Sequence, residues 1–197
     1  MSRQLSSTRE KILDAALTLL EAGQGHGVKM GDIAKHAGIS RQAVYLHFAS
    51  KAELLIAATR HLDQRKAIDQ RLQASRVAAT GVERLRAFVE AWGNYIPEIY
   101  GVAKALLAMR DTDREAATAW DQRMHDMREG CEAAITALAN DGRLNPKWNR
   151  DTATDFLWTL LSIRNWEHLR LDCSWTQRQY LESLHTTSER CFVQPPH

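Results

Sequence analysis

The sequence has few prolines and glycines, which interrupt helices, and few cysteines, which can form disulfides or bind metals. Four prolines and ten glycines are spread over 197 residues. The three cysteines, Cys131, Cys173 and Cys191, show no CxxC spacing, which argues against a disulfide scaffold or a zinc ribbon and favours a reducing cytosol. The longest apolar runs fall far below the roughly 18 residues of a membrane span. The N-terminus also lacks the apolar segment of a secretory signal, so we expect a cytoplasmic protein without a membrane partner.

Motifs of common enzyme sites are missing as well. The sequence contains no HExxH, no GxSxG, no phosphate-binding glycine loop and no GxGxxG. Residues 24–27 are rich in glycine but follow a predicted helix, which favours a loop. Glu167 and His168 lie near Cys173 without a recognised metal-ligand spacing. We therefore expect no enzyme, no cofactor and no metal site; a helical enzyme or ligand carrier is the alternative.

The remaining signals are those of helices. Apolar residues recur at spacings of three and four, and alternation of β-branched residues is nearly absent, which predicts an all-α fold of about nine helices. A capping box at Ser7 and Glu10 predicts the first helix start. Caps and breakers predict the other helices over residues 30–36, 41–47, 51 to about 75, 81–96, 98–110, 113–139, 151–171 and 176–192.

Residues 30–48 combine two short helices with a tight turn at Gly38, the layout of a helix-turn-helix. Glycine suits the left-handed conformation that such a turn requires. The helical period directs Arg41 and Gln42 outward, where arginine can bond a guanine edge and glutamine an adenine edge. Tyr45 and His47 can donate to phosphates, and Lys51 adds charge at the next helix N-terminus. A plain helical hairpin with a solvated polar face is the alternative interpretation.

Charge supports a polyanion partner only weakly. The net charge of the chain is +2, and residues 1–65 hold nine Lys and Arg against six Asp and Glu. This mild basic excess is compatible with binding nucleic acid.

Several short motifs follow one another over about the first 60 residues. They are Asp32-Ile33-Ala34, Ala37-Gly38-Ile39-Ser40, the pair Tyr45 and Phe48, and the pair Lys51 and Leu54. Their types and order resemble the TetR family of transcriptional regulators. The resemblance implies a three-helix DNA-binding domain in residues 1–50, and an effector-binding and dimerisation domain in residues 51–197 that begins with a linking helix. It implies a homodimer on a double-stranded, pseudo-palindromic operator, most simply a repressor that a small molecule releases.

The resemblance also implies roles for individual residues. Arg41 and Gln42 would read bases, while Tyr45, His47 and Lys51 would hold phosphates. With Ser40 and Lys29 at the helix starts, the predicted DNA-binding set is Lys29, Ser40, Arg41, Gln42, Tyr45, His47 and Lys51. Three residues depart from the family pattern, each at the loss of a polar contact: Lys29 in place of a capping Ser or Thr, Gly31, and Ala43 in place of a common Thr.

All six tryptophans lie beyond residue 90, and aromatic and methionine side chains suit flat apolar ligands. The predicted effector-binding set shares three helix faces: Trp92, Tyr95, Trp120, Met124, Met127, Trp158, Ser162, Asn165 and Trp166. Ordinary core or dimer interface is the alternative for each. The charge of the effector stays open, because Glu90, Glu98, Asp155 and Glu167 would favour a cation whereas Arg110, Arg123 and Arg164 would favour an anion.

The last two predicted helices carry apolar stripes. One stripe holds Phe156, Leu157, Leu160, Leu161 and Ile163, and the other holds Tyr180, Leu181, Leu184 and Cys191. Two such helices from each of two chains would form a four-helix bundle about a two-fold axis.

Overall fold

The computed structural model describes residues 2–23 and 27–195, and this part of the chain is helical without a β-strand. The predicted all-α fold is confirmed. A single pair of residues, Leu144 and Val193, forms an isolated antiparallel β-bridge. The predicted loop at residues 24–27 lies mostly outside the described residues. The helices are α1 (Ser2–Ala22), α2 (Met30–His36), α3 (Arg41–His47), α4 (Lys51–Arg65), α5 (Ile68–Arg71), α6 (Gln73–Arg76), α7 (Gly81–Met109), α8 (Arg114–Asn140), α9 (Arg150–Leu160), α10 (Ile163–Glu167), the π-helix η1 (His168–Asp172) and α11 (Gln177–Phe192).

Contacts divide the chain into two compact units. The first contains Met1–Lys66 and Ile99–Met124, and the second contains Ala67–Glu98 and His125–His197. The division passes through α7 and α8, so each of these helices contributes to both units. Among the described residues, no helix combines the length and apolar character needed to span a membrane.

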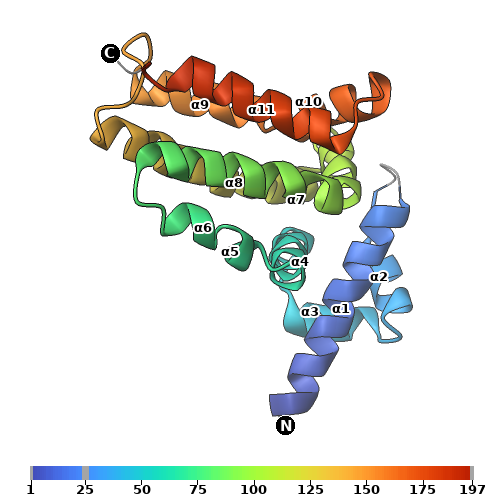
Figure 1. Ribbon diagram of the computed structural model, residues 1–197. Coiled ribbons are helices and arrows are strands. Elements are labelled where there is room, and N and C mark those ends of the chain that lie inside the picture. The colour runs from blue at the N-terminus through green and yellow to red at the C-terminus, as the bar shows by residue number, and fades with distance from the viewer. Residues whose placement is uncertain (1, 24–26, 196–197) are drawn as a thin grey trace. The chain divides into compact units, whose positions relative to one another are not determined.

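The first unit is built on an apolar core from α1 to α4. Helix α1 packs against α4 and α2, and α2 packs against α3 (Figure 1). The buried side chains include Ile12, Leu20, Ile33, Val44, Phe48, Leu54 and Leu55. They recur at helical spacing, so each short helix buries one face and exposes the other.

Two predicted helix ends in this region are wrong. Helix α1 begins at Ser2, ahead of the capping box expected at Ser7. The intervening Arg3, Gln4 and Leu5 are good helix formers and allow this extension. The helix expected over residues 51–75 ends at Arg65, because Ala67 adopts the left-handed conformation with φ 53°. This conformation costs about 1–2 kcal/mol in a residue with a Cβ, and it coincides with the start of the second unit.

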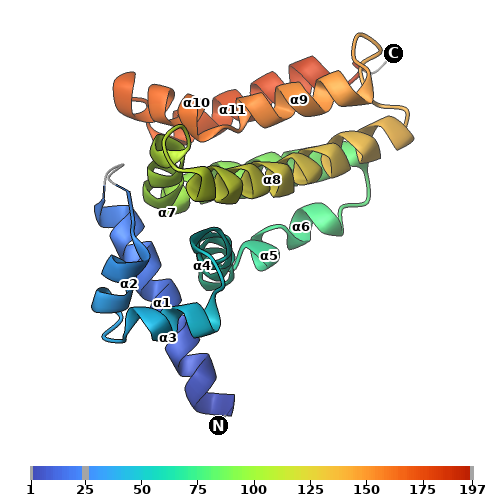
Figure 2. The ribbon, with the colours of Figure 1, turned by 180° about the vertical axis from the view of Figure 1, so that it is seen from behind.

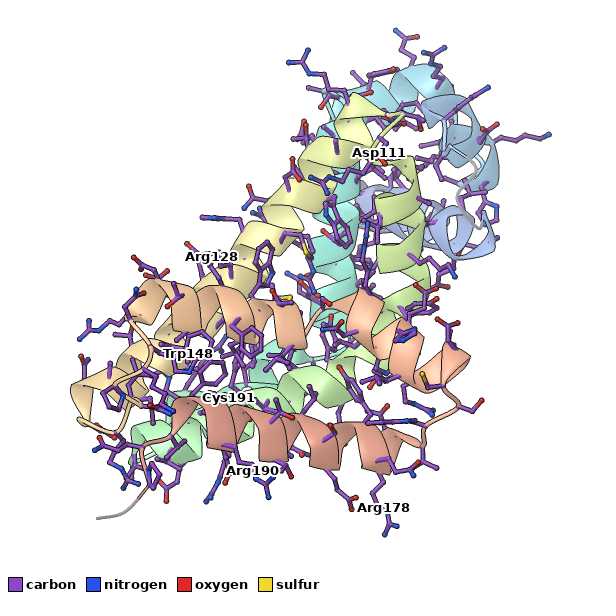
Figure 3. All side chains as sticks on the ribbon, turned by 90° about the horizontal axis from the view of Figure 1, so that it is seen from above. Asp111, Arg128, Trp148, Arg178, Arg190 and Cys191 are labelled. Atoms are coloured by element: carbon purple, nitrogen blue, oxygen red, sulfur yellow. The ribbon has the colours of Figure 1, made fainter. Side chains whose placement is uncertain are left out.

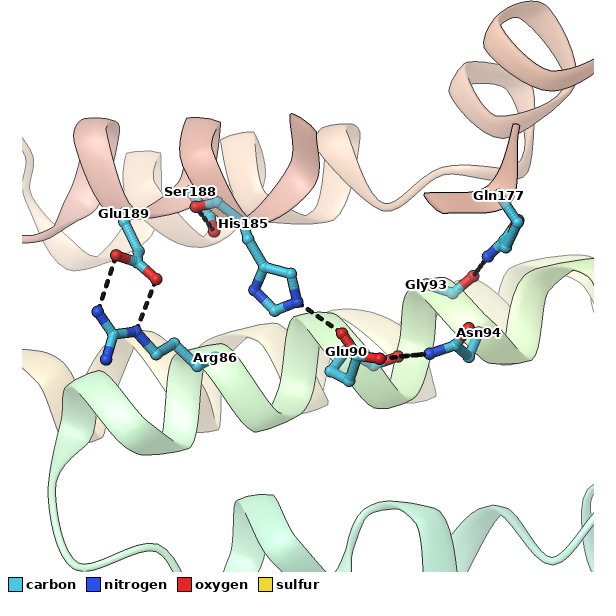
Figure 4. Close-up of polar contacts among 8 residues, drawn as sticks. All are labelled: Arg86, Glu90, Gly93, Asn94, Gln177, His185, Ser188 and Glu189. Atoms are coloured by element: carbon cyan, nitrogen blue, oxygen red, sulfur yellow. Dashed lines mark hydrogen bonds and ion pairs between the residues drawn. The ribbon is translucent and has the colours of Figure 1, made fainter. Parts of the chain in front are cut away.

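The expected helix end before Pro97 is also wrong. Helix α7 continues through Pro97 to Met109. Proline has no N–H for the carbonyl four residues earlier, which here belongs to Gly93. The Gln177 side-chain Nε2 donates to that carbonyl oxygen at 3.0 Å (Figure 4). A partner distant in sequence therefore satisfies the acceptor that proline leaves unpaired.

The helix expected over residues 151–171 is interrupted at Ser162. The Ser162 hydroxyl accepts from the Asn165 backbone N–H at 3.3 Å and so caps α10. The Asn165 side chain donates to Thr159 O at 2.6 Å, and Trp92 Nε1 donates to Leu161 O at 3.3 Å. These bonds add side-chain donors to carbonyls at the end of α9, where Thr159 O also accepts from the Ser162 backbone N–H at 3.2 Å.

Helices α9 and α11 of the second unit run side by side in two opposite views (Figure 2). Near the N-terminal end of α9 and the C-terminal end of α11, Trp148 stacks on Phe156 at 5.3 Å between ring centroids. Trp148 also contacts Phe192 at 5.4 Å. The Trp148 indole donates to the Cys191 carbonyl at 2.9 Å; both residues are labelled in Figure 3. The aromatic cluster therefore anchors the loop before α9 to the end of α11.

Candidate nucleic-acid interface

The helix-turn-helix is formed by α2, the turn at Gly38 and α3. Gly38 has φ 69°, the left-handed conformation that was predicted for it. The turn is closed by a hydrogen bond from the Ile39 N–H to Ala34 O at 3.0 Å. The Ser40 hydroxyl accepts from the Ala43 N–H at 3.1 Å and caps α3. The start of α3 is thus fixed by local bonds that the sequence encodes.

One face of α3 is buried and the other faces solvent. Val44 and Phe48 are 0% and 1% exposed, whereas Arg41, Gln42 and Tyr45 are exposed. The Arg41 guanidinium lies 5.7 Å from the Tyr45 ring centroid, and its Nη2 donates to the Tyr45 hydroxyl at 3.4 Å. This contact orders two donor-bearing side chains on the outward face.

Leu46 also lies on this outward face, although it was not among the predicted DNA-binding residues. Its side chain is 82% exposed, although it is large and apolar. The i,i+4 spacing from Gln42 would have identified it. An exposed leucine beside arginine and glutamine is suited to apolar contact with the methyl group of thymine.

The other predicted DNA-binding residues differ in how far their side chains are exposed. Lys29 and Ser40 are exposed, and Lys29 precedes α2 without a side-chain cap, as its chemistry led us to expect. His47 is half-buried at the end of α3. The Lys51 side chain is 14% exposed and forms an ion pair with Asp113. Six of the seven residues therefore lie at or near the exposed side of the motif, and Lys51 already has a carboxylate partner.

Comparison with known proteins identifies the motif. Residues 12–58 match the family described as bacterial regulatory proteins, tetR family. Residues 12–58 thus match a DNA-binding domain of the TetR family. The transcriptional activator FasR of Mycolicibacterium smegmatis is 37% identical over 89 residues, 45% of this chain and 40% of FasR. The regulator BetI of Rhizobium meliloti is 37% identical over 81 residues, 41% of this chain and 39% of BetI. The matches thus span less than half the length of these two relatives.

Solved structures extend the likeness of fold to nearly the whole chain. A transcriptional regulator from Saccharomonospora viridis, solved in complex with choline, has a TM-score of 0.74 at 20% identity and covers 96% of this chain and 100% of its own. NalD of Pseudomonas aeruginosa, a repressor of a multidrug efflux pump, has a TM-score of 0.68 at 22% identity and covers 96% and 97%. At these identities the likeness supports the TetR-type fold alone.

The effector-binding residues predicted from the sequence fall into both units. Trp120 and Met124 belong to the first, and the other seven belong to the second. In the first unit Trp120 lines a cavity of about 20 Å³, together with Thr59, Leu62 and the paired Asp63 and Arg123. That volume holds about one water molecule.

In the second unit several of these residues make structural contacts. Trp92 and Tyr95 are buried and contact each other at 5.6 Å between ring centroids. Trp166 is buried and donates to the Gln177 amide oxygen at 3.3 Å. Met127 is buried, and Trp158 is half-buried. Because Trp92, Ser162 and Asn165 bond to the interruption between α9 and α10, their polar atoms have structural partners.

At least five of the seven charged residues considered for the effector have an ion-pair or hydrogen-bond partner within the same unit. Glu90 bonds His185 at 2.7 Å, and Glu98 bonds Arg71 at 2.6 Å (Figure 4 shows the former). Asp155 pairs with Arg128 at 2.8 Å. Arg110 lies 3.8 Å from Asp121. This pairing removes the simple argument from charge for a cationic or an anionic effector.

The apolar stripes of α9 and α11 contribute several side chains to the core of the second unit. Leu157, Leu161, Tyr180 and Leu184 are buried within the single chain, whereas Phe156 is 36% exposed. The Tyr180 hydroxyl is buried and has no hydrogen-bond partner among the described residues. Burial raises the pKa of this phenol, so it remains a neutral donor.

Proposed function

We propose that this chain is a ligand-responsive transcriptional regulator of the TetR family that binds DNA through the outward face of α3. The observation that carries the proposal is the division of α3 into a buried face with Val44 and an exposed face with Arg41, Gln42 and Tyr45. Arginine and glutamine are the side chains best suited to read guanine and adenine in the major groove. The TetR-family match over residues 12–58 supports it.

We further propose a homodimer that represses transcription from a pseudo-palindromic operator. Residues 1–50 would form the DNA-binding domain and residues 51–197 the domain that dimerises and binds the effector. Two copies of α3 about 34 Å apart, or a multiple of that spacing, would meet successive major grooves on one side of the duplex. The exposed Phe156 on α9 supports a dimer contact along the α9–α11 face.

The effector would act by binding one conformation of the dimer better than the other. A small molecule lowers DNA affinity only to the extent that it prefers the DNA-free state. Trp92, Tyr95 and Trp166 in the second unit, and Trp120 in the first, are the proposed aromatic contacts. Choline serves as the first probe, because a solved protein of similar fold holds it.

A salt titration separates the regulator from a ligand carrier. The probe is a fluorescein-labelled duplex of mixed sequence, about 30 base pairs long, which accommodates two half-sites. The affinity of a DNA-binding dimer must fall steeply and linearly with the logarithm of salt concentration. Absence of binding at low salt by folded protein would favour a carrier. Arg178→Ala provides a control, because it removes one positive charge from α11, outside the helix-turn-helix, where the side chain is 85% exposed.

Tryptophan fluorescence tests the effector proposal separately. Saturable quenching by choline in the wild type, weakened in a Trp158→Ala variant, would support a site in the second unit. Quenching that is identical in the wild type and the variant would remove Trp158 from the site. Release of the bound duplex over the same ligand range would connect the two activities.

A further inference from the structure

We propose that Asp113 and Glu115 act as an internal substitute for a DNA phosphate, so that the N-terminus of α4 must release them before it can bind DNA. Both carboxylates contact α4 inside the first unit. The inference rests on the proposed DNA-binding function and describes how that function is held in check.

The first carboxylate engages the lysine that was expected to hold a phosphate. Lys51 Nζ donates to Asp113 Oδ2, and the two side chains are only 14% and 19% exposed. The other oxygen, Asp113 Oδ1, accepts from the backbone N–H groups of Glu115 at 3.1 Å and Ala116 at 3.2 Å. Burial by itself would raise the pKa of Asp113, but the bonds from Lys51 and Ala116 hold the pKa below its ordinary value. The carboxylate is therefore ionised and fixed at the start of α8.

The second carboxylate engages the backbone of α4. Glu115 Oε1 accepts from the Ala52 N–H at 3.2 Å. The Ser50 hydroxyl accepts from the Glu53 N–H at 3.1 Å, which leaves fewer free donors at this helix end. A helix N-terminus attracts anions through its unpaired N–H groups and its dipole. Asp113 and Glu115 thus supply two acceptors to the backbone N–H and the ammonium group that a phosphate would contact.

Competition follows from this shared chemistry. A phosphate oxygen and a carboxylate oxygen accept the same charge-assisted bonds from lysine and backbone N–H. The ion pair with Asp113 neutralises the Lys51 ammonium and holds it where it is only 14% exposed, so Lys51 attracts a phosphate less strongly while the pair is intact. DNA affinity therefore depends on how firmly the turn between α7 and α8 holds its two carboxylates against α4.

The test uses an Asp113→Asn variant of the full-length chain. Asparagine is as good a helix cap as aspartate, so the bonds to Glu115 and Ala116 N–H are kept while the ion pair with Lys51 is removed. The probe is the mixed-sequence duplex described above, measured by fluorescence anisotropy at one fixed salt concentration. We expect Asp113→Asn to bind about two- to fivefold more tightly than wild type, the range that corresponds to an ion pair near the surface.

Two controls separate competition from a general effect of charge. Asp111→Asn makes the same charge change two residues away, at an exposed position in the same turn (Figure 3), and should leave affinity nearly unchanged. In a Lys51→Gln background, Asp113→Asn should give no gain. An equal gain in Asp111→Asn, or a gain that persists without Lys51, overturns the proposal.

Glu115→Gln provides a second variant should Asp113→Asn prove unstable in thermal denaturation. It should also tighten binding, because it removes one negative charge from the N-terminus of α4, but by a smaller factor, because the amide oxygen can still accept from the Ala52 N–H. Duplex binding by wild type with no gain in either variant contradicts the competition alone. Failure of every variant to bind the duplex at low salt contradicts the proposed DNA-binding function, and the competition with it.

Discussion

The side-chain amide of Gln177 donates to the carbonyl oxygen of Gly93, the acceptor that Pro97 leaves without its helical partner. The same amide accepts from the Trp166 indole at 3.3 Å, so one side chain on α11 connects two other elements of the second unit. This bridge allows α7 to continue through a proline that would ordinarily end or kink a helix.

Replacing Gln177 by alanine should destabilise the protein by about 1–3 kcal/mol, the cost of leaving partly buried polar groups unpaired. In a Pro97→Ala background the loss should be smaller, because the alanine N–H can bond the Gly93 carbonyl. Urea unfolding of wild type, the two single variants and the double variant measures the difference. Equal losses in both backgrounds would show that the Gln177–Gly93 bond is independent of the proline.

This bridge also marks the limit of what the sequence can predict. The ends of α2 and α3 were predicted correctly because the turn at Gly38 and the cap at Ser40 are local. The behaviour of Pro97 was not predicted, because it depends on a glutamine 80 residues away. Ser162 was predicted to line a ligand site, whereas its hydroxyl accepts from the Asn165 N–H and caps α10.

The candidate site shows the same contrast. The outward positions of Arg41, Gln42 and Tyr45 follow from helical spacing alone. The ion pair between Lys51 and Asp113 joins residues 62 positions apart, and nothing in the local sequence indicates it. Leu46 was missed for a different reason, because only polar side chains were considered as DNA contacts.

Two glycines of the helix-turn-helix should respond in opposite directions to alanine. Gly31 lies in α2 with no atom within 4 Å of an added Cβ, so Gly31→Ala should stabilise the protein by about 0.5–1 kcal/mol. Gly38 has a positive φ of 69°, so Gly38→Ala should destabilise it by about 1–2 kcal/mol. Chemical denaturation provides both values, and the same sign in both variants would contradict the assigned conformations.

Acid should weaken the second unit through Glu189. Its hydrogen bonds from Arg86, at 2.6 and 2.9 Å, hold the pKa of Glu189 below its ordinary value (Figure 4). A carboxylate with a lower pKa in the folded state stabilises the fold above the unfolded pKa of about 4.3, and this stabilisation is lost as the pH falls through the lowered folded value.

Glu189→Gln should therefore lower the free energy of unfolding at neutral pH by less than about 1 kcal/mol, because the pair is substantially exposed. The variant should also show a weaker loss of stability below pH 4.3 or so. Glu182→Gln, on the same helix and 64% exposed, serves as the control. Urea unfolding from neutral to acidic pH measures both, and parallel pH profiles for wild type and Glu189→Gln would refute the assignment.

Tyr180→Phe should not destabilise the protein. The buried Tyr180 hydroxyl has no partner among the described residues, so its removal should leave the free energy of unfolding unchanged or raise it by up to about 1 kcal/mol. Trp148→Phe, which loses the bond to Cys191 O, should instead cost about 1 kcal/mol. A clear loss of stability in Tyr180→Phe would reveal a partner for the hydroxyl.

The central claim is that the exposed face of α3 reads a DNA sequence, and a parallel selection tests it most directly. Fragmented DNA of the source organism is selected on purified wild-type protein and on Arg41→Ala at roughly physiological salt, and the retained fragments are sequenced. The account predicts that wild type enriches a short inverted repeat. Arg41→Ala should relax the preference at one position of each half-site, at a cost of about 1–3 kcal/mol per contacted base pair. The same repeat enriched equally by both proteins, or no repeat enriched by folded wild type, would contradict it.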